Sequence, residues 1–185
     1  MAHDKPFRLR VLEAITDSLK QITPANGYKQ DLSENVFRGR LWYGEDDPLP
    51  LVSIVDDPLP VTQLMAGGGA QGDGTESTGA WTLLIQGFIE DDKVNPTDPA
   101  QYLMADVKKR LAFERNRKTS GAHGGGGYNA FGMGGDVESL TIGAGVVRPP
   151  DYDVSSKAYF WLTLTITVNE DLSDPYAGHR RQPCV

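Results

Sequence analysis

The stretch SKAYFWLTLTITVN, residues 156–169, decides the fold of this chain. Two kinds of side chain alternate along it, which is the period of a β-strand with two different faces. One predicted face holds Phe160, Leu162, Leu164, Ile166 and Val168, and the other holds Tyr159, Trp161, Thr163, Thr165 and Thr167. Residues 156–169 at about 3.4 Å each span roughly 48 Å, well beyond the roughly five or six residues of a typical strand. Part of this strand is therefore expected to serve something beyond its own sheet.

Two more strands are predicted upstream of this stretch. Residues 137–147 form the nearer one, with Leu140 and Ile142 as its core residues. Residues 80–90 form the other, and its apolar side chains fall on both faces: Trp81, Leu83, Ile85 and Ile89 on one, Leu84 and Phe88 opposite. A strand that is apolar on both faces is expected near the centre of a sheet.

Two helices are predicted from apolar stripes with helical spacing. Residues 8–22 place Val11, Leu12, Ile15, Leu19 and Ile22 on one stripe, and the segment from Thr23 to Gly27 ends that helix. Asp98-Pro99 is a typical helix start. The helix that follows is expected to reach about residue 116, with Leu103, Val107 and Leu111 on its buried side.

The N-terminal half adds two shorter strands. Residues 35–43 alternate, which predicts a strand with Phe37, Leu41 and Tyr43 on its buried face. Residues 51–55 form a short apolar run between two Asp-Asp-Pro-Leu-Pro blocks, which are interpreted as acidic turns. Proline at both ends of this run limits ladder pairing there.

Glycine-rich sequence occupies residues 66–79 and 120–135. Neither stretch has enough apolar side chain to offset its ordering entropy alone. Both are predicted to be mobile loops that become ordered only against partners.

The predicted order of elements is helix, three strands, helix, two strands. Strands in hairpin-like runs favour an antiparallel sheet over a βαβ arrangement. The sequence therefore predicts an α+β fold: a mainly antiparallel β-sheet with two helices packed on one face and long glycine-rich loops. A single domain is expected over residues 1–185, ending in a tail at about 172–185.

The overall composition limits the classes of function. A formal net charge of −7 disfavours a general nucleic-acid binder and docking on anionic lipid. The one cysteine, Cys184, allows no disulfide within the chain. No run of 18 apolar residues occurs, and residues 1–10 lack the apolar core of an export signal. We therefore expect no membrane partner and a reducing compartment.

Acidic groups at the ends of predicted strands are the candidates for metal chemistry. They are Glu45-Asp46-Asp47, Asp56-Asp57 and Glu90-Asp91-Asp92. Clustered carboxylates bind Mg²⁺ or Ca²⁺, and a nuclease would use two such groups. Solvated turns are the simpler interpretation, because no calcium-loop pattern occurs and the three histidines have no ligand spacing. We expect no catalytic residue, no cofactor and no metal.

Two surfaces remain as candidates for binding. The basic segment Lys108 to Lys118 matches the negative end of its helix dipole and is interpreted as a solvated helix end, with contact to phosphates as the alternative. Tyr159, Trp161 and Thr163 share the second face of the last strand, which indicates a packing or interface surface.

Several segments together resemble phage tail-terminator or tail-completion proteins. They are Asn26-Gly27-Tyr28, Val36-Phe37-Arg38-Gly39-Arg40, Asp47-Pro48-Leu49-Pro50 leading into Val52-Ser53-Ile54, Gln86-Gly87-Phe88 with Asp91-Asp92, Pro96-Thr97-Asp98-Pro99-Ala100, and Val147-Arg148-Pro149-Pro150. The resemblance covers the order of elements from about residue 8 to 176.

The resemblance implies a structural subunit of the virion, assembled in the host cytoplasm. Such a subunit forms a ring, commonly a hexamer, that caps the tail tube, joins tail to head or neck, and lets DNA pass without specific binding. An acidic lumen would keep the duplex from sticking, so Glu45, Asp46, Asp47, Glu90, Asp91 and Asp92 are candidates for a negative band along the channel. The alternatives are a DNA-binding neck or packaging factor and a divalent-metal nuclease.

Overall fold

A computed structural model of the chain describes residues 3–41, 43–44, 46–56, 76–119, 127–151 and 155–176. The elements are α1 (Phe7–Leu19), β1 (Val36–Arg38), β2 (Leu51–Asp56), β3 (Glu76–Ile89), α3 (Asp98–Arg115), β4 (Val137–Arg148) and β5 (Ala158–Asp171). Three short 3₁₀ turns are η1 (Pro24–Asn26), η2 (Ala130–Gly132) and η3 (Gly134–Asp136). The predicted order of helices and strands is confirmed.

The five strands form one sheet in the order β1-β2-β3-β5-β4. Only β1 and β2 run parallel, and every other neighbouring pair is antiparallel. The α+β fold with a mainly antiparallel sheet is therefore confirmed. The central place of β3 is confirmed as well, since β2 pairs with one side of it and β5 with the other.

The length of β5 is explained inside the sheet. Each residue from Ala158 to Asp171 lies opposite a residue of β3, from Ile89 back to Glu76. Its other side pairs with β4, so β5 is an interior strand. A partner strand of equal length therefore accounts for the length of β5, while the prediction that part of it serves something beyond its own sheet stays a prediction.

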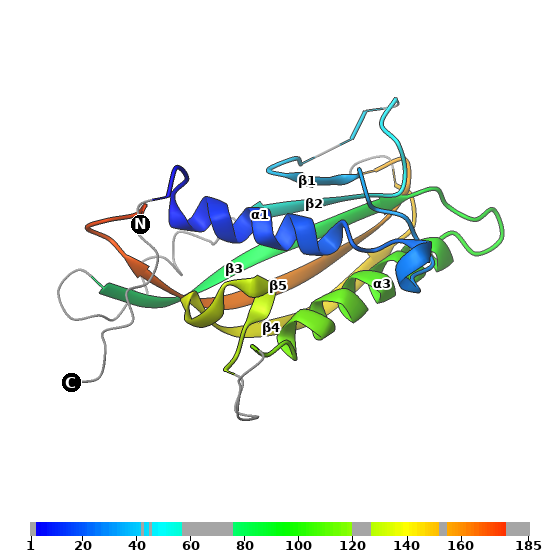
Figure 1. Cartoon of the computed structure of the whole chain (residues 1–185). Helices are drawn as coiled ribbons and strands as arrows, with labels where there is room; N and C mark the ends of the chain where they lie inside the picture. Colours follow the sequence, from blue (N-terminus) through cyan, green and yellow to red (C-terminus); the bar gives the residue numbers. More distant parts are fainter. Residues whose placement is uncertain are drawn as a thin grey trace.

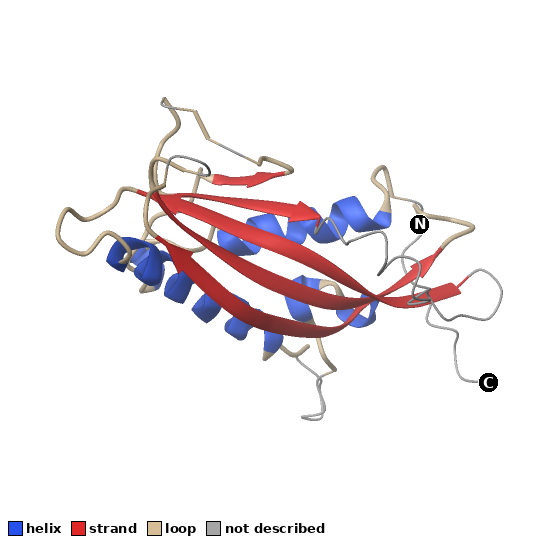
Figure 2. Cartoon of the chain, turned by 180° about the vertical axis from the view of Figure 1, so that it is seen from behind, coloured by secondary structure: helices blue, strands red, loops and turns tan. Residues whose placement is uncertain are grey.

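Both helices pack on one face of this sheet, as predicted (Figures 1 and 2). α1 buries Phe7, Val11, Ile15 and Leu19, and α3 buries Leu103, Val107 and Leu111. They meet the apolar face of β5, whose Phe160, Leu162 and Leu164 are fully buried. Among the described residues, no helix has the length and apolar character needed to cross a membrane.

The strand predicted over residues 35–43 is much shorter in the structure. Gly39 has a φ of +69°, and β1 ends at Arg38 directly before it. Val36, not Phe37, faces the helices and is 5% exposed, while Leu41 is 60% exposed. The predicted buried face is therefore wrong: Phe37 and Tyr43 pack against the opposite side of the sheet.

The predicted glycine-rich loops are wrong over part of their length. Residues 76–79 belong to β3, where they pair with the end of β5, and residues 66–75 lie outside the described part. Residues 127–135 are packed: Tyr128 bridges to Lys118, and Ala130 and Phe131 are buried in the core. Two apolar side chains and a buried carboxylate partner anchor this segment, and residues 120–126 lie outside the described part.

Candidate functional site

The predicted acidic residues gather at one end of the sheet. Asp46 and Asp47 precede β2, and Glu90, Asp91 and Asp92 follow β3. Because β2 and β3 are antiparallel, with Leu51 opposite Phe88, both segments meet at the end that lies to the right in Figure 1. Glu45 lies outside the described residues.

Two of these carboxylates already pair with cations. Asp47 Oδ2 accepts from Arg40 Nη2 at 2.5 Å and from the Gly44 N–H at 2.6 Å. These two hydrogen bonds hold the pKa of the Asp47 carboxyl below its ordinary value. Glu90 pairs with Lys157, and this contact raises the pKa of the Lys157 ammonium.

The other described carboxylates of this group form no ion pair within the part of the chain that the structure covers. Asp92 Oδ1 accepts from the N–H groups of Asn95, at 2.7 Å, and Val94, at 2.8 Å, which lowers the pKa of its carboxyl. Asp46 and Asp91 form neither an ion pair nor a hydrogen bond with the described residues. Asp46, Asp91 and Asp92 thus stay outside the ion pairs of the described residues, although Asp91 also acts on the Lys157 ammonium and Lys93 follows Asp92 directly in the chain.

A shallow hollow of about 390 Å³ adjoins this end of the sheet. Its lining includes Asp47, Glu90, Lys157 and the Tyr43 ring. No group of three or more His, Cys, Asp or Glu side chains suited to a metal ion occurs among the described residues. In this hollow the Lys157 ammonium pairs with Glu90, while Asp47 pairs with Arg40.

An aromatic cluster lies on the sheet face that carries no helix. The ring of Tyr43 lies 5.0 Å from that of Phe88, Phe88 lies 6.2 Å from Tyr159, and Tyr159 lies 5.3 Å from Trp161. Leu49, Leu51 and Phe37 complete the cluster. These residues come from β1, β2, β3, β5 and the loops beside them, so the sheet itself brings the cluster together.

The predicted interface residues on β5 differ in exposure. Tyr159 is only 2% exposed, and its hydroxyl donates to Asp151 Oδ2 at 2.7 Å. Burial, together with Asp151, raises the pKa of this phenol to about 12. Trp161 and Thr163 are half-buried and remain on the uncovered face.

Two polar atoms next to each other on this face have no hydrogen bond. Trp161 and Gln86 are cross-strand partners of β5 and β3. The indole Nε1 of Trp161 and the amide Oε1 of Gln86 are both shielded from solvent, and neither finds a partner within the described part of the chain. Beyond them the same face continues as Thr163, Thr165 and Thr167, which are half-buried.

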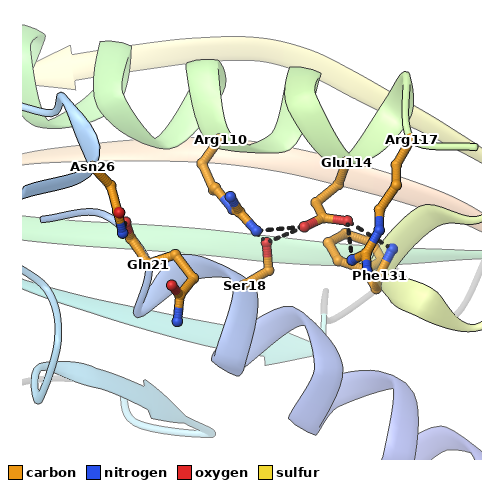
Figure 3. A network of polar contacts seen from close by, with 7 residues as sticks. All are labelled: Ser18, Gln21, Asn26, Arg110, Glu114, Arg117 and Phe131. Carbon is orange, nitrogen blue, oxygen red and sulfur yellow. Dashed lines mark hydrogen bonds and ion pairs between the residues drawn. The ribbon is translucent and has the colours of Figure 1, made fainter.

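A buried carboxylate that sequence reasoning missed joins the two helices (Figure 3). Glu114 on α3 is 1% exposed and accepts from Arg110 Nη2 at 2.6 Å and Ser18 Oγ at 3.0 Å. It also accepts from the Phe131 N–H at 2.9 Å and from Arg117 Nη1 at 3.3 Å. The signals in the sequence are Arg110 four residues before Glu114 and Arg117 three residues after it, a pattern that also occurs on solvated helix faces.

A second carboxylate of α3 is buried in the same way. Asp106 is 7% exposed, and its Oδ2 accepts from the N–H groups of Lys29, at 2.8 Å, and Gln30, at 3.0 Å. It thereby fixes the segment after α1 against α3.

Comparison of the chain with protein-family models and with curated proteins finds no match.

Proposed function

We propose that this chain is a structural subunit of a phage virion that assembles into a ring at the end of the tail tube. The ring joins the tail to the head or neck and lets DNA pass. The observation that carries the proposal is the uncovered sheet face with its aromatic cluster, since this surface suits contact with further copies of the chain. The resemblance of the sequence to tail-terminator proteins supplies the place in the virion and the expectation of six subunits.

The two halves of the uncovered face have different chemistry. One half, formed by Thr163, Thr165 and Thr167, is polar enough to face solvent, as one face of many antiparallel sheets does. The aromatic half is different: Phe88 and Tyr159 are buried within it, while Trp161 at its edge stays half-buried, and aromatic side chains are enriched at protein interfaces. Trp161 lies at the boundary between the two halves. An interface centred on Trp161 is therefore the best-supported contact between copies.

The unpaired atoms of Trp161 and Gln86 favour such a contact. A buried polar atom without a hydrogen bond costs about 1–3 kcal/mol. A small rearrangement against a neighbouring chain would let the indole N–H donate and the amide oxygen accept. Association then recovers free energy that the isolated subunit lacks.

In this proposal the acidic end of each subunit occupies an equivalent position around the ring. Head-to-tail contacts between identical subunits close into a ring when the rotation between neighbours allows it. Each copy would then place its Asp46, Asp91 and Asp92 at an equivalent position, which makes a negative band. Such a band beside the channel would repel passing phosphates within about one Debye length, roughly 10 Å at 0.1 M salt.

The mass of the assembled species tests the proposal. We expect a ring in native mass spectrometry and in negative-stain images of the purified chain. Trp161→Arg should leave a folded monomer, because a charge then replaces the central interface ring. Leu172→Arg is the matched control, since Leu172 is 63% exposed and lies beyond the end of β5. A monomer at every concentration, together with no ring in assembled particles, would refute the proposal, whereas a ring that tolerates Trp161→Arg would refute only this interface.

A further inference from the structure

The outer surface of α3 has a charge opposite to that of the whole chain. Between residues 99 and 118 the helix and its end carry two carboxylates, Asp106 and Glu114, and both are buried. Asp106 is held by two backbone N–H groups, and Glu114 by the contacts described above. Apart from Asp98, its exposed first residue, the helix therefore turns its negative charge inward, in a chain whose net charge is −7.

The cations of the same segment all remain at the surface. They are Lys108, Lys109, Arg110, Arg115, Arg117 and Lys118, and none of them is buried. Arg110 and Arg117 pair with Glu114, while Lys108, Lys109, Arg115 and Lys118 form no ion pair within the described residues. Lys29, from the segment that Asp106 fixes, adds a fifth unpaired cation. We call these five unpaired residues the cationic face.

Aromatic rings hold several of the cations in place along this surface. The Lys29 Nζ lies 3.7 Å from the centre of the Tyr102 ring, and the Lys109 Nζ lies 4.5 Å from that of Tyr28. Lys109 also donates to the Gly27 carbonyl oxygen at 2.7 Å. Tyr102 is 49% exposed. The surface is thus a fixed arrangement of ammonium groups and rings.

We infer that the cationic face contacts the phosphate backbone of double-stranded DNA. From Lys108 to Arg115, the last residue of α3, the helix rises by about 10 Å, and duplex DNA carries one phosphate charge per roughly 1.7 Å of its axis. Several phosphates therefore fall within reach of the face at once. Exposed Tyr102 and Phe113 add flat apolar surface beside the cations, which suits the carbon atoms of the sugars whatever the base sequence.

The remaining charge of the chain keeps this contact weak. Asp17 lies at the rim of the cationic face, in the hollow that Arg110 and Arg117 also line. The acidic end lies near the start of α3, and the helix is about 27 Å long. The net charge of −7 opposes any approach of DNA. The expected interaction is therefore independent of sequence, sensitive to salt and easily released, as a passing duplex requires.

Fluorescence anisotropy with a labelled duplex tests this inference directly. We expect binding at low salt, with a slope of log K against log salt near −3, as about three to four phosphate contacts give. Affinity should then fall roughly 40- to 150-fold between 50 and 200 mM salt. The triple variant Lys109→Glu, Arg115→Glu, Lys118→Glu should lose binding at every salt concentration, with an unchanged circular dichroism spectrum.

A control with the same change in net charge makes the result specific. Lys5→Glu, Lys20→Glu and Lys93→Glu alter cations outside the cationic face and should weaken binding much less. Lys109→Gln with Lys118→Gln serves if the first triple variant fails to fold, and it should lower the salt slope by roughly two. Equal losses in both triple variants, no binding by the unaltered chain at low salt, or equal competition by polyglutamate would each overturn the inference. None of these outcomes bears on ring formation, which has its own measurement.

Discussion

Glu114 on α3 accepts a hydrogen bond from the backbone N–H of Phe131, 17 residues further along the chain, at 2.9 Å. Phe131 has a φ of +54°, an unusual value for a residue with a bulky side chain. The carboxylate and the buried ring together hold the end of the second glycine-rich stretch in this conformation. Because Ser18 on α1 also donates to Glu114, this one carboxylate links α1, α3 and the segment before β4.

Replacing Glu114 should therefore weaken the fold considerably. Glu114→Ala leaves the Phe131 N–H without its acceptor and two arginines without their counter-charge. We expect a loss of roughly 2–4 kcal/mol in the free energy of unfolding, measured by urea titration. Glu34→Ala is the control, because Glu34 is exposed, and its effect should stay within about 0.5 kcal/mol. Similar small losses in both variants would show that the network is dispensable.

The two faces of β5 predict different costs for neighbouring substitutions. Leu164 is fully buried against the helices, so Leu164→Ala should lose roughly 2–5 kcal/mol of stability through the cavity it leaves. Thr163 is half-buried on the uncovered face, and Thr163→Ala should lose less than about 1 kcal/mol in the monomer. A denaturant titration of the monomer compares them. Equal losses would mean that this face is covered even in the isolated subunit.

Gly87 on β3 lies where no side chain fits. A Cβ built there would stand 2.1 Å from Cε1 of Phe160, whose ring is fully buried in the core. Gly87→Ala is expected to cost about 1–3 kcal/mol through overpacking. Gly44→Ala should be nearly neutral, since its nearest neighbour atom is 3.6 Å away. Thermal unfolding of the two variants measures the difference, and an unchanged melting temperature for Gly87→Ala would contradict the close packing.

Much of this fold follows from sequence periodicity, and the errors have physical causes. The alternation in residues 158–168 predicted both faces of β5 correctly, because one face packs in the core under the helices and the other lies on the side of the sheet that carries no helix. The same reasoning failed at residues 35–43, where Gly39 ends β1 and Leu41 turns to solvent. Alternation also cannot give the position of a strand in a sheet, so the interior place of β5 had to come from the pairing with both β3 and β4.

The candidate sites were less predictable for a similar reason. The described members of the acidic groups lie beside the ends of β2 and β3, but the ion pairs of Asp47 with Arg40 and of Glu90 with Lys157 depend on tertiary contacts. The cationic face could not be predicted from the sequence, because its charge depends on the burial of Asp106 and Glu114. A count of charged residues along a helix does not distinguish a buried carboxylate from an exposed one. That distinction decides whether the outer surface of the helix is positive or negative.

The Tyr159 phenol should make stability depend on pH in alkaline solution. Its pKa is raised from the ordinary value of 10.0 to about 12, chiefly by burial and then by the contact with Asp151. The unfolded chain releases this proton near pH 10 and the folded chain near pH 12. The contribution is therefore fully present below pH 10 and is lost as the pH rises through 12. Urea titrations at several pH values should show a steeper alkaline decline for the unaltered chain than for Tyr159→Phe, and parallel declines would contradict this assignment.

The acidic end is predicted to repel DNA instead of holding a catalytic metal. Asp46 and Asp91 form no ion pair among the described residues, and Asp92 accepts hydrogen bonds from backbone N–H groups. If these charges face the path of a duplex, Asp46→Asn combined with Asp91→Asn should raise the DNA affinity of the assembled ring several-fold at low salt. Neutralising Asp4 and Asp174 in the same way should have less effect, because both lie at the opposite end of the sheet, where β5 ends at Asp171 and the His3 N–H donates to the Tyr176 carbonyl oxygen. A nuclease makes the opposite demand, since its carboxylates must bind Mg²⁺ or Mn²⁺ firmly. Calorimetry with both ions and a plasmid-nicking assay separate the two functions. Micromolar metal binding, with cleavage that disappears in Asp91→Asn, would overturn the structural role, whereas tighter DNA binding by the neutralised ring would support it.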